Sequence, residues 1–555
     1  MAVYWVVAEL CACSTATEGG GPGHADAASR RVGIELTPRT VRPDLPQATS
    51  YGGGVALDLS VGELGLRQRL EDLSSLKYDA GLSCLMRGLA RYSPLRLNIP
   101  AGLVDALSSW CGVYDPPPRV ELIEVRDDRY DCVAHDDGPC VDVVDTLVER
   151  ATGSGTLPPG RRFGVGAARL ENNVTRLLVG FAHVVVELET IDRRIDLSAV
   201  IQVKGRLLGG RETPHVEVVA PDGEWRRFGV VMGDDGSFSV ALSCASGRGA
   251  YRVEVLAEGP HGPEVAALFP IFCGVSPPSE IEFETEHLDP SVSAVDVARL
   301  SLLYLNHARA ARALPRLEWD DGAASVGSGH SGDMAHNGFV GHVSPTAGGV
   351  VDRFSAAKIR GLVIRENVAR GYGPKGIHVG LMGSPGHRVN ILAEDVTRVG
   401  IGVVFGEQET DQDDGSRPIF VTQVFYRPPD NRGPRDLARG LRRDVDKARA
   451  VHGERRLAWH SGLSKLAQSR VDARVRGGAR DEEAHFSERV WALGFGEVTR
   501  HDVFAEDYGA MVALDVWLGI RAHKEVGAGI ARVPAQGDTS AGFALCILVA
   551  TRDTP

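Results

Sequence analysis

The chain lacks a long apolar segment, a surplus of basic residues and cysteine pairs with metal-binding spacing. None of its apolar runs reaches the roughly 18 residues of a membrane-spanning helix, so we expect no transmembrane span. Lys and Arg number 61 against 73 Asp and Glu, giving a net charge of −12. This balance argues against nucleic acid as a partner, because neutralising phosphates requires surplus cations. Because no Cys-x-x-Cys pair occurs, the sequence also argues against a cysteine zinc site.

The composition that remains is that of a globular protein. Hydrophobic residues make up 43% of the chain and charged residues 24%, which excludes wholesale disorder. At 555 residues the chain is too long for one hydrophobic core. We therefore expect three or four domains.

The N-terminal residues have features of an export signal. Met1 to Ala12 is mostly apolar, and Leu10 to Cys13 has the outline of a lipoprotein processing site, which predicts lipid attachment at Cys13. The small, Gly-rich stretch Ser14 to Ala27 suits a flexible tether. The fit is incomplete, because no basic residue precedes the apolar stretch and Glu9 interrupts it. A start codon placed too far downstream or a disordered tail is the alternative interpretation.

The cysteines agree with export, since disulfides persist in oxidising compartments. Beyond Cys13, all cysteines except Cys546 fall into local pairs, which leaves Cys546 as a buried thiol. The sequence alone leaves the connectivity open. The local pairs are Cys84 with Cys111, Cys132 with Cys140, and Cys244 with Cys273.

Proline and glycine clusters divide the chain into segments. Short apolar runs separated by turn signals such as Pro221-Asp222-Gly223 predict an all-β, immunoglobulin-like sandwich. The expected segments are a leader and tether at 1–55, a degenerate α+β domain at 56–192, the sandwich at 193–276, a complete α+β domain at 293–428 and a second degenerate one at 435–555.

An internal repeat links the three α+β segments. Leu317-Glu318-Trp319-Asp320-Asp321-Gly322 recurs as Leu457-Ala458-Trp459-His460-Ser461-Gly462 and, more faintly, as Leu76-Lys77-Tyr78-Asp79-Ala80-Gly81. A strand-like Gly-x-Gly follows each copy farther along the chain, at Gly400 to Gly402, Gly527 to Gly529 and Gly164 to Gly166. Such self-similarity predicts three copies of one fold.

The middle copy carries a series of specific motifs. They are Leu302 to Arg309, His330 to Ala335, Gly338 to Pro345, Glu366 to Gly371, Ser384 to Leu392 and Val421 to Phe425. In order and spacing these motifs resemble the bacterial branch of the CAP superfamily (cysteine-rich secretory protein, antigen 5, pathogenesis-related) over residues 293–428. The resemblance implies an α-β-α sandwich around an antiparallel sheet, usually secreted.

By this resemblance, His342, Glu366 and His387 match three members of the family's central-cavity set of two histidines and two acids. The two histidines match the pair that binds zinc in some relatives. Two imidazoles and a carboxylate can hold a divalent metal with one position open to water, or can transfer protons. Alternatively, they hydrogen-bond one another and hold the turns together. In the family, the second acid normally lies in the helix that leads to the Ser-Pro-Gly-His motif. Here that segment, Gly373 to Leu381, contains no acid, which weakens both the metal and the catalytic interpretation.

Further candidates surround these three residues. His330, on a predicted helix, borders the cleft or packs as a buried histidine. Ser344 beside His342 suggests a nucleophile, but a serine before proline after a turn more often caps the next segment. Asn367, next to Glu366, is a candidate ligand contact.

The sequence thus predicts an exported protein of the periplasm, cell surface or extracellular space. Its cleft is expected to bind a small apolar or lipid-like molecule, a glycan or an envelope protein. The alternative is a metal-dependent, protease-like hydrolase that uses the same cleft, with zinc as the candidate metal. A third interpretation is a purely architectural envelope protein. A missing acid favours binding over catalysis.

Overall fold

The structure is a computed structural model that divides into two compact units, residues 1–428 and 429–555. It describes residues 32–552 except 74–75, 95–98, 127–130, 154–161, 172, 234, 408–416, 430–432, 477–484, 506–507, 522–523 and 535–541. Cys13 and the predicted export signal lie outside the described residues. Among the described helices, none has both the length and the apolar character needed to cross a bilayer.

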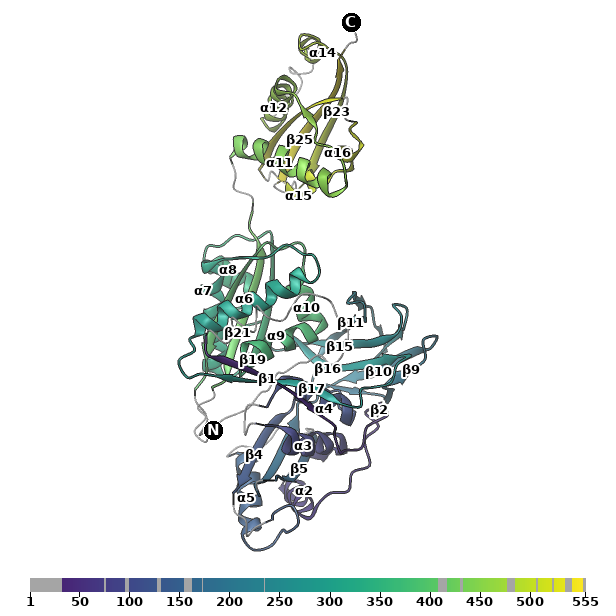
Figure 1. Ribbon diagram of the computed structural model, residues 1–555, viewed down its shortest axis with the longest axis vertical. Coiled ribbons are helices and arrows are strands. Elements are labelled where there is room, and N and C mark those ends of the chain that lie inside the picture. The colour runs from purple at the N-terminus through teal and green to yellow at the C-terminus, as the bar shows by residue number, and fades with distance from the viewer. Residues whose placement is uncertain are drawn as a thin grey trace. The chain divides into compact units, whose positions relative to one another are not determined.

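The segment 293–428 forms a mixed α+β domain around a four-stranded sheet (Figure 1). The strand order is β18-β20-β21-β19, in which β18 runs parallel to β20 and the other pairs are antiparallel. A capping box of Ser293 and Asp296 starts the first helix. The elements are α6 (Ala294–Ala310), β18 (Glu318–Trp319), α7 (Asp321–Asn337), α8 (Val350–Ala356), β19 (Val363–Gly371), α9 (Pro374–Gly383), α10 (Pro385–Ile391), β20 (Arg398–Phe405) and β21 (Ile419–Arg427).

Apolar clusters lie on both faces of this sheet. One cluster contains residues of α6, α9 and α10 together with Ile401 and Phe425. The other faces α7 and α8 and contains Phe354, Val424 and Tyr426. Because successive strand residues point to opposite faces, Val424 and Phe425 enter different clusters, and helices cover both faces of the sheet.

The first segment has a sheet with the same strand order, β3-β5-β6-β4, and again only its first pair is parallel. Leu178 of β6 belongs to a cluster with residues of α3 and α4, and Leu177 to a cluster with residues of α2 and α5. The elements are α2 (Val61–Leu73), β3 (Lys77–Tyr78), α3 (Ala80–Tyr92), α4 (Ala101–Cys111), β4 (Arg119–Val125), α5 (Pro139–Thr152), β5 (Arg162–Arg169) and β6 (Thr175–Ala182).

The unit of residues 429–555 repeats this order as β22-β24-β25-β23, with β22 parallel to β24. Cys546 is a buried thiol on β25. The elements are α11 (Pro434–Val451), β22 (Ala458–Trp459), α12 (Ser461–Val475), α14 (Phe486–Trp491), β23 (Phe495–Ala505), α15 (Tyr508–Val512), α16 (Asp515–Gly519), β24 (Glu525–Val533) and β25 (Gly542–Arg552).

The repeated sequence motif has one local structure in all three places. Its aromatic residue ends a two-residue strand, and the next side chain caps the following helix by accepting a backbone N–H. Asp320 caps α7 through Ala323, Asp79 caps α3 through Leu82, and His460 caps α12 through Leu463. The repeat therefore encodes a strand-to-helix junction.

The Gly-x-Gly strands allow these helices to lie directly on their sheets. A Cβ atom at Gly402 would collide with the backbone of Gly327 and Ser328 in α7. The same collision with helix backbone would occur at Gly166 against α3 and at Gly529 against α12. Glycine is thus required by close approach at matching positions of the three sheets.

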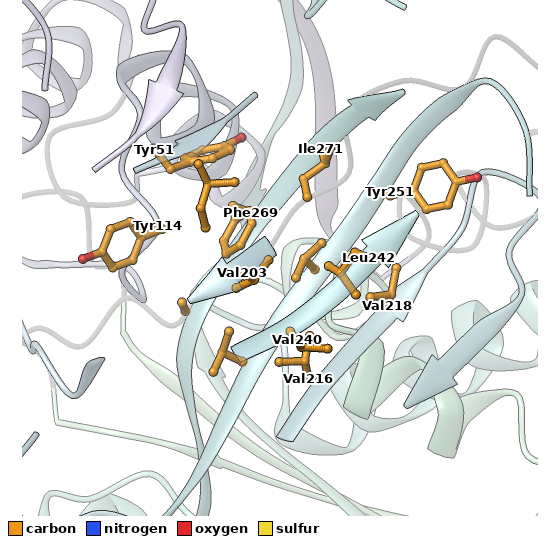
Figure 2. Close-up of a cluster of buried hydrophobic side chains, with 14 of the residues drawn as sticks. Tyr51, Tyr114, Val203, Val216, Val218, Val240, Leu242, Tyr251, Phe269 and Ile271 are labelled. Atoms are coloured by element: carbon orange, nitrogen blue, oxygen red, sulfur yellow. The ribbon is translucent and has the colours of Figure 1, made fainter. Parts of the chain in front are cut away.

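Two further sheets form an all-β unit between the first two α+β segments. Their inner faces share one core, in which Val203 and Val240 of the smaller sheet meet Val216 and Phe269 of the larger one (Figure 2). Tyr51, from outside the unit, packs against Phe269. The smaller sheet has the order β13 (Val231–Met232), β14 (Ser237–Ser243), β10 (Val200–Leu207), β7 (Val186–Leu188), and the larger has the order β12 (Trp225–Phe228), β11 (Glu212–Val219), β15 (Gly249–Gly259), β16 (Gly262–Cys273), β9 (Arg194–Ile195).

The disulfides follow the local pairs seen in the sequence. Cys84 bonds Cys111, Cys132 bonds Cys140, and Cys244 bonds Cys273. The last of these joins the end of β14 to the end of β16 and so links the two sheets of the all-β unit.

The described part of the predicted tether differs from a free linker. Within it, β1 (Ile34–Val41) pairs antiparallel along its whole length with β17 (Ile281–Leu288), and β2 (Ser50–Tyr51) pairs with β8 (Ile191–Asp192). The physical reason is that Ile34 and Tyr51 are buried among residues far along the chain, a contact that local composition does not reveal.

Glu286 on β17 gives this region a pH-dependent stability. Its carboxylate accepts hydrogen bonds from the backbone N–H groups of Lys375 and Gly376, both at 3.0 Å, at the start of α9. Burial raises the pKa of Glu286 from 4.5 to about 7. Because the folded-state pKa lies above the unfolded one, this contribution to stability is fully present below about pH 4.5 and is lost as the pH rises through about 7.

We expect Glu286→Gln to remove this part of the pH dependence. Between about pH 4.5 and pH 8, the free energy of unfolding of the variant should rise relative to the unsubstituted protein by up to about 3 kcal/mol, the equivalent of raising the pKa from 4.5 to about 7. Hydrogen exchange of β17 and α9 at the two pH values measures the change. Glu284→Gln, on the same strand and more exposed, is the control. An unchanged pH dependence in Glu286→Gln contradicts the prediction.

Candidate functional site

Glu366 lies at the centre of a buried polar cluster in the middle domain. It sits on β19, and its Oε1 lies 3.0 Å from Nδ1 of His342, in the loop after α7. Its other oxygen forms an ion pair with Arg353 of α8. Arg353 also donates to the carbonyl oxygens of His342 at 3.1 Å and Gly348 at 2.6 Å. One carboxylate thus holds the His342 side chain, while Arg353 holds the loop that carries it.

His387 faces His342 from the first turn of α10. The two imidazole centroids are 6.4 Å apart. Nδ1 of His387 lies 2.8 Å from Oγ of Ser384, the residue that caps α10, and that hydroxyl lies 2.6 Å from Oε1 of Glu254 on β15. Burial, together with the neighbouring His342, lowers the pKa of His387 to about 3. His387 is therefore neutral at physiological pH.

The hydrogen bonds assign the proton on His342. A carboxylate only accepts, so His342 donates its Nδ1–H to Glu366, and in the neutral ring Nε2 carries the lone pair. The His342 side chain is 27% exposed, so a ligand can reach it. In that form His342 presents a hydrogen-bond acceptor beside the neutral ring of His387.

His330 and Ser344 support the loop around His342. Nε2 of His330, buried in α7, contacts the carbonyl oxygen of Gly341 at 2.8 Å, and burial lowers the pKa of His330. Oγ of Ser344 accepts the backbone N–H groups of Thr346 at 3.0 Å and Ala347 at 2.8 Å. This is the geometry of a turn cap, the role that the sequence favoured over a nucleophile.

Asn367 ties α10 to the sheet. Its buried amide donates to the carbonyl oxygen of His387 at 3.1 Å and to Oε1 of Gln423 at 3.2 Å, and it accepts from Asn390 at 2.9 Å. With these contacts Asn367 fixes the position of the first turn of α10, which carries His387. The sequence marks it as a candidate ligand contact, but every hydrogen bond described for its side chain is internal.

The donor set does not fit a resident zinc ion. A catalytic zinc site usually has three protein ligands and one open position. Among the described residues the two imidazoles have no third partner, because both oxygens of Glu366 are engaged, one by His342 and one by Arg353. In the same part of the chain, no group of three or more His, Cys, Asp or Glu side chains is arranged to hold a metal.

Arg353, Ser384 and Glu254 are the residues that sequence reasoning missed. Asp352 and Arg353 are neighbours in sequence and could be taken for an ion pair. In the structure, Asp352 accepts from the backbone N–H of Gly349 at 2.9 Å and Arg353 pairs with Glu366. Ser384 lies within a recognised motif, so its proximity to His387 was available in the sequence. Glu254 gave no signal, because it belongs to the all-β unit.

A separate cavity of about 920 Å³ lies where α4, β16, β17 and α9 meet. Its lining does not include His342, Glu366 or His387. An ion pair between Asp105 and Arg252, at 3.2 Å, forms part of its wall. Much of the remaining wall is apolar, with Ala106, Phe272, Phe283 and Ile377.

The middle domain matches a known family in sequence. Residues 302–425 match the family model "CAP: Cysteine-rich secretory protein family", so this segment is a CAP domain. The match covers the predicted motifs from Leu302 to Phe425 and includes His342, Glu366 and His387.

Relatives in sequence come from Bacillus subtilis. The uncharacterized membrane protein YlbC is 38% identical over 100 residues, which cover 18% of this chain and 29% of YlbC. The uncharacterized protein YkwD is 32% identical over 115 residues, 20% of this chain and 44% of YkwD. The chain thus spans less than half the length of the curated relatives that it matches.

Solved structures give a weaker likeness. An extracellular protein containing an SCP domain from Bacillus anthracis is 19% identical, with 42% of this chain and 83% of that chain covered and a TM-score of 0.22. An outer surface protein from Borrelia burgdorferi is 18% identical, with 25% of this chain and 96% of that chain covered and a TM-score of 0.22.

Proposed function

We propose that this chain is an exported binding protein of the bacterial envelope, whose CAP cleft binds a hydroxyl-bearing ligand such as a glycan through His342 and His387. The observation that carries the proposal is the pair of imidazoles held by Glu366 and Ser384, each through Nδ1. A lone pair on an imidazole nitrogen can accept a hydrogen bond from a hydroxyl group of the ligand. The three disulfides support export, because such bonds persist in oxidising compartments.

An aromatic surface beside His342 supports a ring-shaped ligand. Phe339 and His261 stack with their centroids 4.7 Å apart, and both are partly exposed. Ligand sites commonly combine such apolar rings with a few fixed polar groups. A sugar could place its apolar face on these rings and its hydroxyls on the imidazoles.

The same contacts weigh against the alternative, a metal-dependent hydrolase. Hydrolysis by a metal-bound water needs a metal held by the protein, and the cleft provides only two imidazoles for it. Both oxygens of Glu366, the acid of the cleft, already have partners in His342 and Arg353, so neither is free to activate a water molecule.

The proposal is tested by titrating the full chain, with its histidines isotopically labelled, with a soluble N-acetylhexosamine tetrasaccharide. We expect the imidazole signals of His342 and His387 to shift, and His342→Ala or His387→Ala to weaken binding about tenfold or more, the loss of one buried hydrogen bond. His336→Ala, on the exposed end of α7, is the control. Equal affinity in all variants refutes the proposal. Stoichiometric Zn²⁺ binding that the cleft variants lose supports the hydrolase instead.

The 920 Å³ cavity favours a second candidate, a small apolar or lipid-like ligand. Its volume and mixed lining are those of sites for drug-sized molecules. A medium-chain fatty acid serves as the probe in a titration of the full chain with its histidine, phenylalanine and alanine residues isotopically labelled. Shifts confined to the signals of Phe272, Phe283 and Ala106 would assign the fatty acid to this cavity, and shifts of the two imidazoles would assign it to the cleft.

We further propose that residues 56–192 and 435–555 are degenerate CAP copies and that 193–276 is an immunoglobulin-like spacer. The common strand order and the shared Gly-x-Gly contacts support the first statement. The two packed sheets joined by Cys244 and Cys273 support the second. The outer copies have lost the His-x-Ser-Pro and Ser-Pro-Gly-His motifs, which suits scaffold or partner-binding roles.

A further inference from the structure

The all-β unit packs against both histidines of the CAP cleft. Strands β11 and β15 contact α10, the helix that carries His387 (Figure 1). The turn between β15 and β16 reaches His342, because the carbonyl oxygen of His261 accepts the backbone N–H groups of His342 and Val343, both at 2.9 Å. Each half of the histidine pair is thus in contact with the neighbouring unit.

Glu254 of β15 is the most buried of these contacts. Its relative exposure is 0%, and its two oxygens accept from Oγ of Ser384 at 2.6 Å and from the backbone N–H of Gly386 at 2.9 Å. Burial raises the pKa of Glu254, against the hydrogen bonds from Ser384 and Gly386, which lower it. A buried acid is costly unless its hydrogen bonds are satisfied, so its placement at this helix start requires an explanation.

A structural role as a helix cap does not require this acid. Ser384 already caps α10 through the backbone N–H of His387 at 3.4 Å. An uncharged side chain such as Gln at position 254 could accept the backbone N–H of Gly386 without burying a charge. What the carboxylate of Glu254 adds is a second oxygen, which is a fixed acceptor for the one hydroxyl proton of Ser384.

We infer that Glu254 is a positioning residue of the CAP cleft, which acts through Ser384 to hold His387 with its proton on Nδ1. An ionised Glu254 only accepts, so Ser384 donates its proton to Glu254 and its oxygen accepts Nδ1–H of His387. Nε2 of His387 then keeps its lone pair. The all-β unit supplies an acid that the helix before Ser384 lacks, and the cleft is shared by two parts of the chain.

This inference rests on the proposed function, because it assigns the acceptor atom that the ligand would meet. Glu366 plays the corresponding part for His342. In their neutral forms the two histidines then have the same tautomer, with the proton on Nδ1. His342 is held by a carboxylate of its own domain, and His387 by a serine and a carboxylate of the neighbouring unit.

Glu217 is the matched control for Glu254. It lies on β11, is equally buried and also approaches α10, since a Cβ on Gly386 would stand 3.4 Å from its Oε2. Its oxygens accept instead from Trp225 at 3.0 Å and from Arg227 at 2.6 Å. It makes no described hydrogen bond to Ser384.

The test is the tautomer of His387, read from imidazole nitrogen shifts of the full chain without ligand at pH 8.5, where Glu254 is ionised. We expect Nδ1–H in the unsubstituted protein. In Glu254→Gln, one amide oxygen remains to accept from Gly386, and the amide NH₂ donates to Ser384. Ser384 must then turn its proton to His387, and the ring switches to Nε2–H. Ser384→Ala should remove the preference for Nδ1–H.

Glu217→Gln should leave the tautomer unchanged, and backbone amide spectra check that each variant is folded. The inference is overturned if folded Glu254→Gln keeps Nδ1–H, or if Glu217→Gln switches the ring equally. Because the readout needs no ligand, failure of the glycan titration would leave it intact. Conversely, a retained tautomer in Glu254→Gln would refute the positioning role without touching the proposed ligand.

Discussion

Replacing Gly402 by alanine is expected to destabilise the CAP domain by about 3 kcal/mol or more, because overpacking of this kind cannot be relieved by a side-chain rotation. The new Cβ would collide with the backbone of Gly327 and Ser328. Either α7 must move off β20 or the strand must bend. His330 lies on α7 and supports the loop of His342, so the cleft should loosen as well.

The measurement is hydrogen exchange of β20 and α7 in the full chain, where protection should fall by at least about two orders of magnitude. Gly332→Ala is the control in the same helix, because the nearest atom to its new Cβ is Val404 Cγ2 at 3.9 Å. That substitution should stabilise the helix by up to about 1 kcal/mol. Equal protection in both variants would show that the packing of α7 on β20 does not depend on the close approach at Gly402.

The second large effect is expected from Glu366→Leu. This change leaves Arg353 buried without its carboxylate, and an uncompensated buried charge of this kind typically costs about 3–5 kcal/mol. His342 loses its hydrogen-bond partner at the same time, so its preferred tautomer should be lost together with local stability.

Hydrogen exchange of α8 and β19, with the imidazole nitrogen shifts of His342, measures both consequences. Adding Arg353→Met should recover part of the lost stability, since it removes the stranded charge. Glu224→Ala, which breaks the fully exposed pair with Arg226, should cause no measurable change. Additive losses in the double variant would mean that the two buried side chains do not depend on each other.

The sequence predicted the CAP domain because its motifs are short and keep fixed spacings. The strand-to-helix junction at Trp319 and Asp320 and the close-packed glycines at 400 and 402 each act over a few residues, so one sequence is enough to reveal them. The motif order also named His342, Glu366 and His387, which the structure brings together. Their roles in binding remain proposals.

The disulfide pairs could also be predicted, because their cysteines are close in sequence. The pairing of β1 with β17 could not be predicted. Strand partners some 250 residues apart leave no periodic trace in either segment. The described residues of the predicted tether look polar in the sequence because β1 is a half-exposed strand, in which apolar and polar residues mix.

By itself the sequence predicted a CAP domain at residues 293–428, of which 302–425 match the family model, in an acidic chain with local cysteine pairs. Only the tertiary structure decided that Arg353 pairs with Glu366 and that Glu254 stands behind Ser384. The physical reason is that hydrogen bonds between distant segments depend on how whole domains pack. That packing is set by many buried side chains together, and no single motif records it.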